Sequence, residues 1–268
     1  MITGKPHQVA IKSIFALFGI YPTRTKAYEL LIADRAKMQQ LTTWLNLLKR
    51  IPDEQVAYFA RNLEFSNSQF FQDLFVSSEL AGKHHGFFVE VGACDGQRFS
   101  NSLFFERNLN WSGILAEPAK AWHRDLMLNR KAHIDTRAVW QSSGLKLLFN
   151  ESKSKEVSTL AQFSDSDFHA NLRKDGNTYE VETITLGDLL ESHAAPPIID
   201  YLSIDTEGSE FEILSSFDFE KRLIRCITCE HNFTANRDKI FKLLTSKGYK
   251  RKFVEFSDCD DWYFIGSH

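Results

Sequence analysis

The sequence predicts an α/β protein built on an open, doubly wound sheet of about seven strands. Short apolar runs recur along the chain, and most of them are followed by a polar loop and a helical pattern. Strands that alternate with helices indicate a parallel sheet with helices on both faces. Two final runs, at 249–256 and 262–265, have no helix between them, which predicts that an antiparallel pair closes the sheet.

The first 80 residues are predicted to form a helical extension rather than part of the sheet. Apolar residues recur there at three- and four-residue steps, without a strand pattern. Pro52 suits the first turn of a helix over 53–63, and a further helix is expected over 69–80, closed by Gly82. The domain that carries the sheet is therefore expected to cover 81–268.

Five principal strands are predicted between residues 87 and 229. They cover 87–91, 113–117, 134–139, 199–204 and 223–229. The helices that follow are expected from residue 101, and over 119–129, 209–216 and 235–246. Two additional strands, at 145–149 and 179–184, bracket a polar insert over 150–178. A polar excursion of this length is more often a functional lid or a mobile loop than part of a core.

Charge is distributed unevenly along the chain. The 268 residues hold 32 Lys and Arg against 35 Asp and Glu, which argues against a general nucleic-acid binder. Residues 1–50 nevertheless carry a net charge of about +6 and the remainder about −9, summing formal charges along the sequence. This basic segment is either a solvated helical surface or a contact for an anionic partner.

The N-terminal apolar stretch fits an amphipathic helix. Ile11, Ile14, Phe15 and Phe18 fall on one helix face, which is expected to pack on the body, on a second subunit or on a membrane surface. No apolar run approaches the roughly 18 residues of a membrane span. Four Cys in a chain of this length do not form a disulfide framework, so we expect a reducing cytoplasm.

Acidic residues stand at or beside the predicted ends of four strands. They are Glu90, Glu117, Asp205 and Glu230. Ligands of an open doubly wound sheet bind where the carboxyl ends of the strands meet. Buried carboxylates are costly unless a ligand, a cation or a hydrogen-bond donor meets them. The alternative for each residue alone is a helix N-cap or a solvated loop.

The loop over 92–96, GACDG, limits which ligand fits this edge. Its spacing is not the G-x-G-x-x-G dinucleotide fingerprint, and it lacks the Lys-Ser/Thr of a phosphate-binding loop. The nearby Glu90 and Asp95 suit a ligand with positive charge, such as a sulfonium with an ammonium. Glu117 lies about two dozen residues after the glycine loop, where acids of nucleotide-binding folds accept ribose hydroxyls.

These residues resemble the FkbM methyltransferases. The motifs are FVEVGACDG (88–96), SN (100–101), WSGILAEP (111–118), IDTEGSE (204–210) and EHN (230–232), with SQFFQDL (68–74) upstream. The resemblance runs from about residue 68 to the terminal strand pair, roughly three quarters of the chain. It implies a Rossmann-like class I fold and an S-adenosylmethionine-dependent enzyme that methylates hydroxyl oxygens of sugars or natural products.

The resemblance also implies roles for individual residues. Glu90, Gly92, Asp95 and Gly96 would shape the methionine end of the cofactor pocket, and Glu117 would bind the ribose. The strand end over 135–139 would border the adenine, and Asp205 with the turn over 207–208 would face the sulfonium and the acceptor. The residues implied to contact the cofactor are Glu90, Gly92, Asp95, Gly96, Ser100, Asn101, Glu117, Pro118, Asp135, Ala138, Asp205 and Glu207.

A base that removes the acceptor's hydroxyl proton is the remaining requirement of the chemistry. His231 is the first choice because an unperturbed imidazole is largely neutral at neutral pH; the alternative is a structural histidine at a strand end. Asp205 is the second choice. A magnesium-dependent version, with Asp205, Glu230 and Asn232 as ligands, is a further alternative because these are hard oxygen donors.

The function predicted is a cytoplasmic S-adenosylmethionine-dependent O-methyltransferase acting on a carbohydrate hydroxyl, in surface-polysaccharide or lipid-linked glycan assembly. Methylation of a small secondary metabolite and a non-catalytic nucleotide-binding scaffold are the alternatives. Basic residues of the insert, including Lys155 and Arg173, are candidates for contacting an anionic acceptor. Cys226 and Cys229 fall on opposite strand faces and are expected to be core thiols rather than a metal or redox pair.

Overall fold

The structure is a computed structural model, and it describes residues 42, 45–46, 49–51 and 53–266. The chain divides into two compact units, Met1–Asn46 and Leu47–His268. The predicted amphipathic helix over 11–18 and most of the basic segment lie outside the described residues. No helix of the described residues is long and apolar enough to cross a membrane. Two helices that precede residue 80 belong to the same compact unit as the sheet. The predicted boundary between a helical extension and the methyltransferase-like domain at residue 80 stays a prediction.

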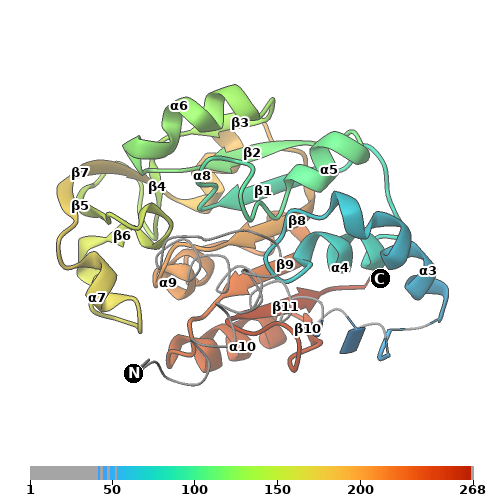
Figure 1. Cartoon of the computed structure of the whole chain (residues 1–268). Helices are drawn as coiled ribbons and strands as arrows, with labels where there is room; N and C mark the ends of the chain where they lie inside the picture. Colours follow the sequence, from blue (N-terminus) through green and yellow to red (C-terminus); the bar gives the residue numbers. More distant parts are fainter. Residues whose placement is uncertain (1–41, 43–44, 47–48, 52, 267–268) are drawn as a thin grey trace, which may run out of the picture. The chain divides into compact units, whose positions relative to one another are not determined.

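The second unit is built on a seven-stranded sheet (Figure 1). Its strands are β1 (Phe87–Val91), β2 (Ser112–Ala116), β3 (His133–Asp135), β8 (Ile198–Ile204), β9 (Leu223–Glu230), β10 (Lys250–Lys252) and β11 (Asp260–Phe264). The order is β10-β11-β9-β8-β1-β2-β3, with β11 antiparallel between β9 and β10 and the other pairs parallel. The predicted doubly wound sheet with a terminal antiparallel pair is therefore confirmed.

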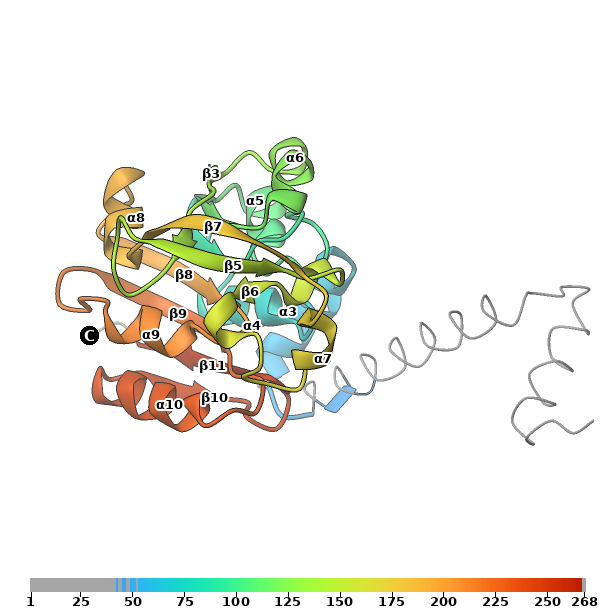
Figure 2. The ribbon, with the colours of Figure 1, turned by 90° about the vertical axis from the view of Figure 1, so that its left-hand side faces the viewer.

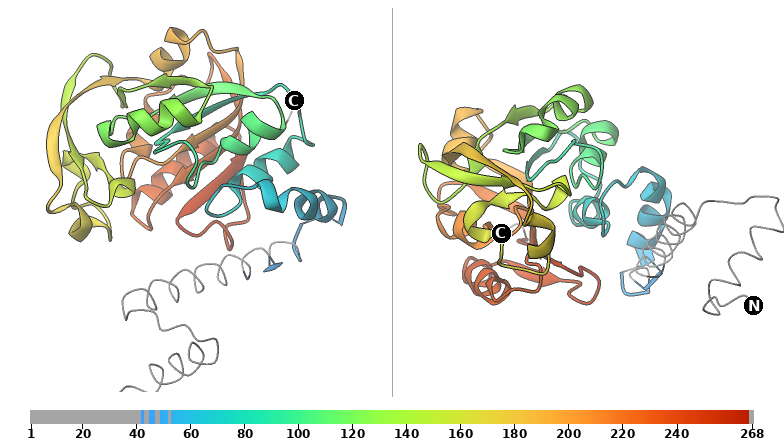
Figure 3. Two further views of the ribbon diagram at one scale, coloured as in Figure 1. Left: turned by 45° about the horizontal axis from the view of Figure 1, so that its top comes forward. Right: turned by 60° about the vertical axis from the view of Figure 1, so that its left-hand side comes forward.

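Helices cover both faces of this sheet (Figure 3). On one face, the apolar side chains of the strands pack with α8 (Leu186–Ser192), α9 (Glu210–Ser215) and α10 (Asn236–Ser246) in a single core cluster. On the other face lie α4 (Gln72–Glu79) and α5 (Leu103–Asn108), where Phe75 stacks on Trp262 and Phe105 contacts Tyr201. The helix α3 (Asp53–Asn62) precedes them, and α6 (Lys120–Asn129) joins β2 to β3.

Strand register brings three strand ends together. Val91 pairs with Ala116 on one side and with Ile204 on the other. The residues that follow these strands therefore meet at one edge, and β1 is where the chain order of the sheet reverses. This is the switch point at which doubly wound sheets bind their ligands.

A second sheet, which the sequence analysis did not predict, lies beside this edge (Figure 2). Its order is β4-β7-β5-β6, from β4 (Ala138–Val139), β5 (Lys146–Glu151), β6 (Thr159–Leu160) and β7 (Asn177–Ile184). The single strand predicted over 134–139 is wrong, because the chain leaves the main sheet after Asp135. The Asp135 carboxylate accepts hydrogen bonds from the amide and guanidinium of Arg137, which turns the chain toward the second sheet.

The polar insert over 150–178 is ordered around short elements. These are two 3₁₀ turns, Lys155–Val157 and Ala161–Phe163, the strand β6 and the helix α7 (Ala170–Arg173). Buried Val157 and Leu160 give the insert an apolar inner side. The insert therefore packs against the body, as a lid would, although its composition is polar.

Two further elements differ from the sequence prediction. The strand expected over 249–256 ends at Lys252, because Phe253 adopts a left-handed φ of 53° and a turn follows. Helix α8 was not predicted; Thr185 caps it by accepting a hydrogen bond from the Asp188 amide.

Candidate active site

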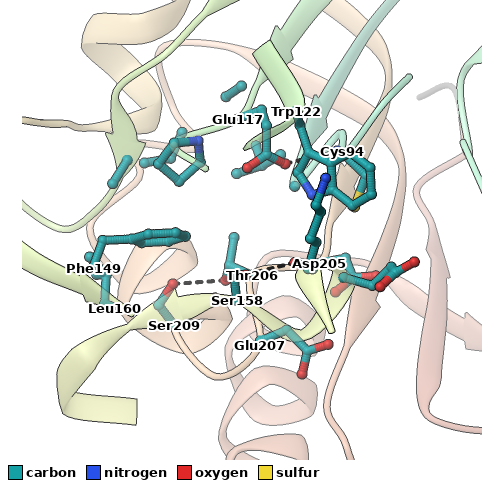
Figure 4. A pocket seen from close by; sticks show the side chains of 18 residues that line it. Cys94, Glu117, Trp122, Phe149, Ser158, Leu160, Asp205, Thr206, Glu207 and Ser209 are labelled. Atoms are coloured by element: carbon teal, nitrogen blue, oxygen red, sulfur yellow. Dashed lines mark hydrogen bonds between the residues drawn. The ribbon is translucent and has the colours of Figure 1, made fainter. Parts of the chain in front are cut away.

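A pocket opens at the carboxyl ends of β1, β2 and β8 (Figure 4). Its empty space is about 580 Å³ when the open space at its mouth is included. The main sheet, the second sheet and the insert all contribute to it. The residues that line it are Val91, Gly92, Cys94, Ala116, Glu117, Pro118, Trp122, Ala138, Val139, Phe149, Lys155, Glu156, Ser158, Leu160, Asp205, Thr206, Glu207 and Ser209.

Glu117 is fixed at the end of β2 by backbone donors. Its Oε2 accepts from the Cys94 amide and its Oε1 from the Ala119 amide, both at 2.8 Å. Burial raises the pKa of Glu117 to about 7, although the two amides act to lower it. A carboxylate offers about four lone-pair sites, so two remain for a ligand. Glu117 can therefore accept two hydroxyl hydrogens in the pocket.

Gly92 allows the loops after β1 and β8 to touch. Its φ is +89°, and a Cβ there would lie 1.7 Å from the Asp205 carbonyl oxygen. Any side chain would separate the loops and change the floor of the pocket. The Gly at this position in the GACDG loop is thus required by packing.

The pocket has an aromatic end, where Phe149 and Leu160 of the second sheet line one side of it (Figure 4). Trp122, on α6, lies across the pocket from them in this view, beside Cys94. The Lys155 ammonium lies 4.8 Å from the centre of the Trp122 ring, a cation–π distance. A planar apolar group is the ligand that such a lining favours.

Three carboxylates gather at the other end. One oxygen from each of Asp205, Glu207 and Glu230 lies within 4.8 Å of the others. Burial raises the pKa of Asp205 to about 7, although a hydrogen bond with Glu230 acts to lower it. Burial and the charge of Asp205 raise the pKa of Glu230 well above its usual value. The group requires a proton or a cation to balance its charge.

Of the three predicted metal ligands, Asp205 and Glu230 belong to this group, and Asn232 does not. Glu207, assigned from the sequence to the sulfonium, completes the group with Asp205 and Glu230. Asn232 instead donates its Nδ2 to Glu207 at 3.0 Å, and its buried Oδ1 has no hydrogen-bond partner. Three oxygen donors suit a divalent cation, but the Arg173 guanidinium already lies 2.6 Å from Glu207.

Glu90 and its neighbours shape the loop after β1 rather than the pocket lining. The Glu90 carboxylate accepts from the Ser100 hydroxyl, the Asn101 amide and the Ser102 hydroxyl, at 2.9, 2.7 and 2.5 Å. The Arg130 guanidinium lies 3.6 Å away. Contacts of Glu90, Ser100 and Asn101 with a cofactor stay predictions.

Asp95, Gly96 and Asp135 also lie outside the lining. Asp95 accepts from the amides of Gln97 and Arg98, which closes a turn. Gly96 has a φ of +76°. Asp135 is bound to Arg137 and to His193, whereas its neighbour in the prediction, Ala138, does line the pocket. Their predicted cofactor contacts remain untested.

His231 is buried below the strand end. Its Nδ1 accepts from the Phe233 amide at 3.0 Å, and its Nε2 lies 3.8 Å from Asp261 without a hydrogen bond. Burial lowers the pKa of His231, although Asp261 acts to raise it, so the imidazole is neutral at neutral pH. It is not among the pocket-lining residues, and its role as base stays a prediction.

The basic residues of the insert have different surroundings. Arg173 is fully buried and bonded to Asp167 and Glu207. Lys153 is exposed and lies 3.5 Å from Asp175. Of the candidates, Lys155 alone lines the pocket, beside Glu156. The expectation that Arg173 contacts an anionic acceptor is therefore wrong.

The comparison with protein-family models agrees with the sequence motifs. A family model described as the methyltransferase FkbM domain matches residues 90–251, more than half of the chain. The chain belongs to the FkbM methyltransferase family. A comparison with curated proteins finds no significant match. Among solved structures, the precorrin-6y C5,15-methyltransferase of Geobacter metallireducens GS-15 is similar, with 13% identity, 72% of this chain and 87% of that chain covered, and a TM-score of 0.38.

As an FkbM methyltransferase, the chain is a transferase of methyl groups, and such enzymes generally take the methyl group from S-adenosylmethionine. Sequence reasoning missed most of the aromatic end of the site. Phe149 and Leu160 come from the second sheet, whose approach to the main sheet no motif signals, whereas Trp122 falls in the helix predicted over 119–129. The polar insert was the one available signal, since long ordered excursions often cover a site.

Cys226 and Cys229 are buried free thiols on β9. Their positions agree with the expectation of core residues. Cys94, by contrast, lines the pocket. Burial and, to a smaller extent, the charge of Glu117 raise the pKa of its thiol well above the usual value. A neutral thiol is the form that fits this acidic site.

Proposed function

We propose that this FkbM protein transfers a methyl group from S-adenosylmethionine to a hydroxyl of a neutral carbohydrate. The observation that carries the proposal is the lining of one pocket by Glu117 and Asp205, with an aromatic end and an acidic end. S-adenosylmethionine has a ribose diol, a planar base and a cationic sulfonium. Each of these groups has a chemically matched part of the pocket.

The cofactor is oriented by that match. Glu117 accepts the two ribose hydroxyls, and the base lies against the aromatic end with Phe149 and Leu160. The sulfonium then faces Asp205 and Glu207. Burial and the charge of Asp205 raise the pKa of Glu207 to about 9 in the free protein, and the Arg173 guanidinium and a bound sulfonium favour its ionised form, which balances the cofactor's charge. Burial of the two carboxylates strengthens the attraction, since a carboxylate and a cation interact more strongly away from bulk water.

The protein's part in the reaction is alignment and proton removal. Methyl transfer is an in-line displacement, so the acceptor oxygen, methyl carbon and sulfur must lie on one line. Asp205 lines the pocket and has a pKa of about 7, which suits a base at neutral pH. His231 remains the second candidate. Its Nδ1 accepts from the Phe233 amide, so the neutral ring carries its proton on Nε2, and it can act as a base only after a local rearrangement frees Nδ1.

The acidic end favours a neutral acceptor over an anionic one. A sugar hydroxyl donates hydrogen bonds to carboxylates, whereas a phosphate or uronate would be repelled. A neutral glycan of a surface polysaccharide or a lipid-linked carrier fits this chemistry, and a hydroxylated secondary metabolite is the alternative. For a lipid-linked acceptor, we propose a cytoplasmic enzyme whose basic N-terminal region contacts the membrane.

A magnesium ion at Asp205, Glu230 and Asn232 is retained as a subsidiary proposal. Bound there, it would lower the pKa of an acceptor hydroxyl. The sulfonium and a shared proton compete with it to balance the same carboxylates. Titration with the metal decides between them.

The test is calorimetric titration with S-adenosylmethionine and S-adenosylhomocysteine, with and without Mg²⁺. We expect micromolar binding of both, followed by transfer of labelled methyl groups to neutral glycans. Asp205→Asn is expected to retain S-adenosylhomocysteine binding, to weaken S-adenosylmethionine binding because a charge facing the sulfonium is lost, and to slow transfer at saturating cofactor by about 10²–10⁴-fold, the usual contribution of a general base. His231→Gln serves as the comparison. No binding by demonstrably folded protein would favour the non-catalytic scaffold.

A further inference from the structure

Arg173 is buried inside the polar insert but bonds to a residue outside it. Its Nε donates to the Val157 carbonyl at 2.6 Å, and its terminal nitrogens donate to Asp167 at 2.9 and 3.0 Å. Its Nη2 also donates to Glu207 Oε2 at 2.6 Å. Arg173 is 1% exposed, so contacts within the protein, which include a longer hydrogen bond to the Phe163 carbonyl at 3.5 Å, must compensate its charge. Arg173 thus connects the fold of the insert to a pocket carboxylate.

Glu207 lies in a turn whose backbone conformation is unfavourable by itself and must be stabilised by neighbouring residues. Its φ is +61°, a left-handed conformation that disfavours side chains with a Cβ. The oxygen that binds Arg173 also accepts from Asn232 Nδ2 at 3.0 Å. The carboxylate is therefore directed by one donor from the insert and one from the end of β9.

The insert contacts the backbone of the same turn at two other points. The Thr159 hydroxyl lies 3.2 Å from the Thr206 carbonyl and 3.0 Å from the Glu207 carbonyl, to which it donates. A Cβ at Gly208 would lie 3.1 Å from the Phe163 Cβ. The insert and the turn therefore pack as one surface, and displacement of the insert removes three supports of Glu207 together.

We propose that Arg173 is a positioning residue that sets the Glu207 carboxylate only when the insert is folded over the pocket. The proposal rests on the assignment of the acidic end to the sulfonium. Folding of the insert then completes the lining of the pocket and positions the Glu207 carboxylate in one step. It supplies Lys155, Ser158 and Leu160 to the lining, and it fixes the negative charge at the reacting sulfur.

Three variants of the full chain separate positioning from support of the insert. Arg173→Lys keeps the positive charge but loses the planar fork that binds Asp167 and Glu207 together. Glu207→Gln removes the charge at nearly constant shape. Asp167→Asn is the matched control, because it weakens the same guanidinium contact entirely within the insert.

The first readout is amide hydrogen exchange without ligand, measured by mass spectrometry. In Arg173→Lys we expect exchange over 205–210 to rise at least about tenfold, together with that of the insert. In Asp167→Asn we expect the increase in the insert alone. Equal patterns in the two variants, or an unchanged turn in Arg173→Lys, would overturn the proposal.

The second readout is the ratio of affinities for S-adenosylmethionine and S-adenosylhomocysteine. The two ligands differ in one methyl group and one positive charge, so the ratio reports negative charge at the sulfur. Arg173→Lys and Glu207→Gln are each expected to lower the ratio about three- to tenfold, and the double variant no further, since both act on one contact. Asp167→Asn is expected to stay within about twofold of the wild type.

Additive losses in the double variant would overturn the positioning role. If the wild type binds neither ligand, the proposed function fails. The exchange experiment still tests the connection between Arg173 and the turn in that case.

Discussion

Glu90 and Glu117 are the same residue type at the carboxyl ends of neighbouring strands, yet their surroundings differ. Glu90 is met by three hydrogen-bond donors and by the Arg130 guanidinium. Glu117 is met by two amides, and its remaining lone pairs face the pocket. Both side chains are buried. Burial alone therefore does not distinguish a structural carboxylate from a ligand-binding one; the count of protein donors does.

The same distinction separates the other acidic residues of this edge. Glu210 accepts from the amides of Thr206 and Gly208 and from a hydroxyl, so it holds the turn at the start of α9. Asp205 and Glu230 lack such donors, and Glu230 Oε2 has no partner. Asp205 and Glu230, at the end proposed to face the reaction, are thus less satisfied than Glu90 and Glu210, which hold the loops around it.

The largest expected effect is on the free energy of unfolding, when Glu90 is replaced. Glu90→Ala leaves three donors and the buried Arg130 without their acceptor, so the free energy of unfolding should fall by about 3–5 kcal/mol. Urea denaturation measures it. Glu90→Gln keeps one acceptor oxygen and should lose less. A loss below about 1 kcal/mol for Glu90→Ala would show that Glu106, 3.4 Å from Arg130, suffices.

For Glu117, which accepts from only two protein donors among the described residues, a substitution should affect ligand binding more than stability. Glu117→Gln is expected to weaken S-adenosylhomocysteine binding about 10- to 100-fold, because hydrogen bonds to a charged group contribute about 1.5–3 kcal/mol. Unfolding should change less than in Glu90→Ala, since neutral Gln avoids the cost of a buried charge. Calorimetry and urea denaturation measure the two quantities, and unchanged affinity would contradict the ribose assignment.

The pH dependence of binding sharpens the contrast. Ribose hydroxyls donate to ionised Glu117, whose pKa is about 7 in the free protein. Below that pH the carboxyl is protonated, so at pH 6 the affinity for S-adenosylhomocysteine should be roughly tenfold below its plateau. Glu117→Gln provides the control and should show a flatter profile. A wild-type affinity that stays constant between pH 5.5 and 8 would refute the assignment.

The smallest effect is expected at Asp135. Burial acts to raise the pKa of Asp135, but its hydrogen bonds with Arg137 and His193 outweigh burial and hold the pKa below 3.8. Asp135→Asn should cost about 1 kcal/mol at neutral pH and leave cofactor affinity within twofold. The stabilisation is present above the unfolded pKa and lost as pH falls through the lower folded value, so the two proteins should converge in strong acid.

Much of the fold could be predicted because the strands of the main sheet are recognisable from short stretches of sequence. The runs that form β1, β8 and β9 are mostly apolar and mostly buried, and each is followed by a helical pattern. The break at Asp135 was not predictable from periodicity, because 134–139 is continuous as a pattern. The hydrogen bonds of its carboxylate with Arg137 and His193 belong to the folded chain, and His193 lies 58 residues away.

The sequence by itself determined the order of strands and helices, the glycine loop and the positions of the acidic residues, since these depend on residue type and on neighbours along the chain. The tertiary structure decided which acids remain free for a ligand. Donors to Glu90 come from ten or more residues away, and Arg173 reaches Glu207 across 34 residues. It also decided that a polar insert closes an aromatic pocket, because packing between sheets depends on contacts that no local pattern contains.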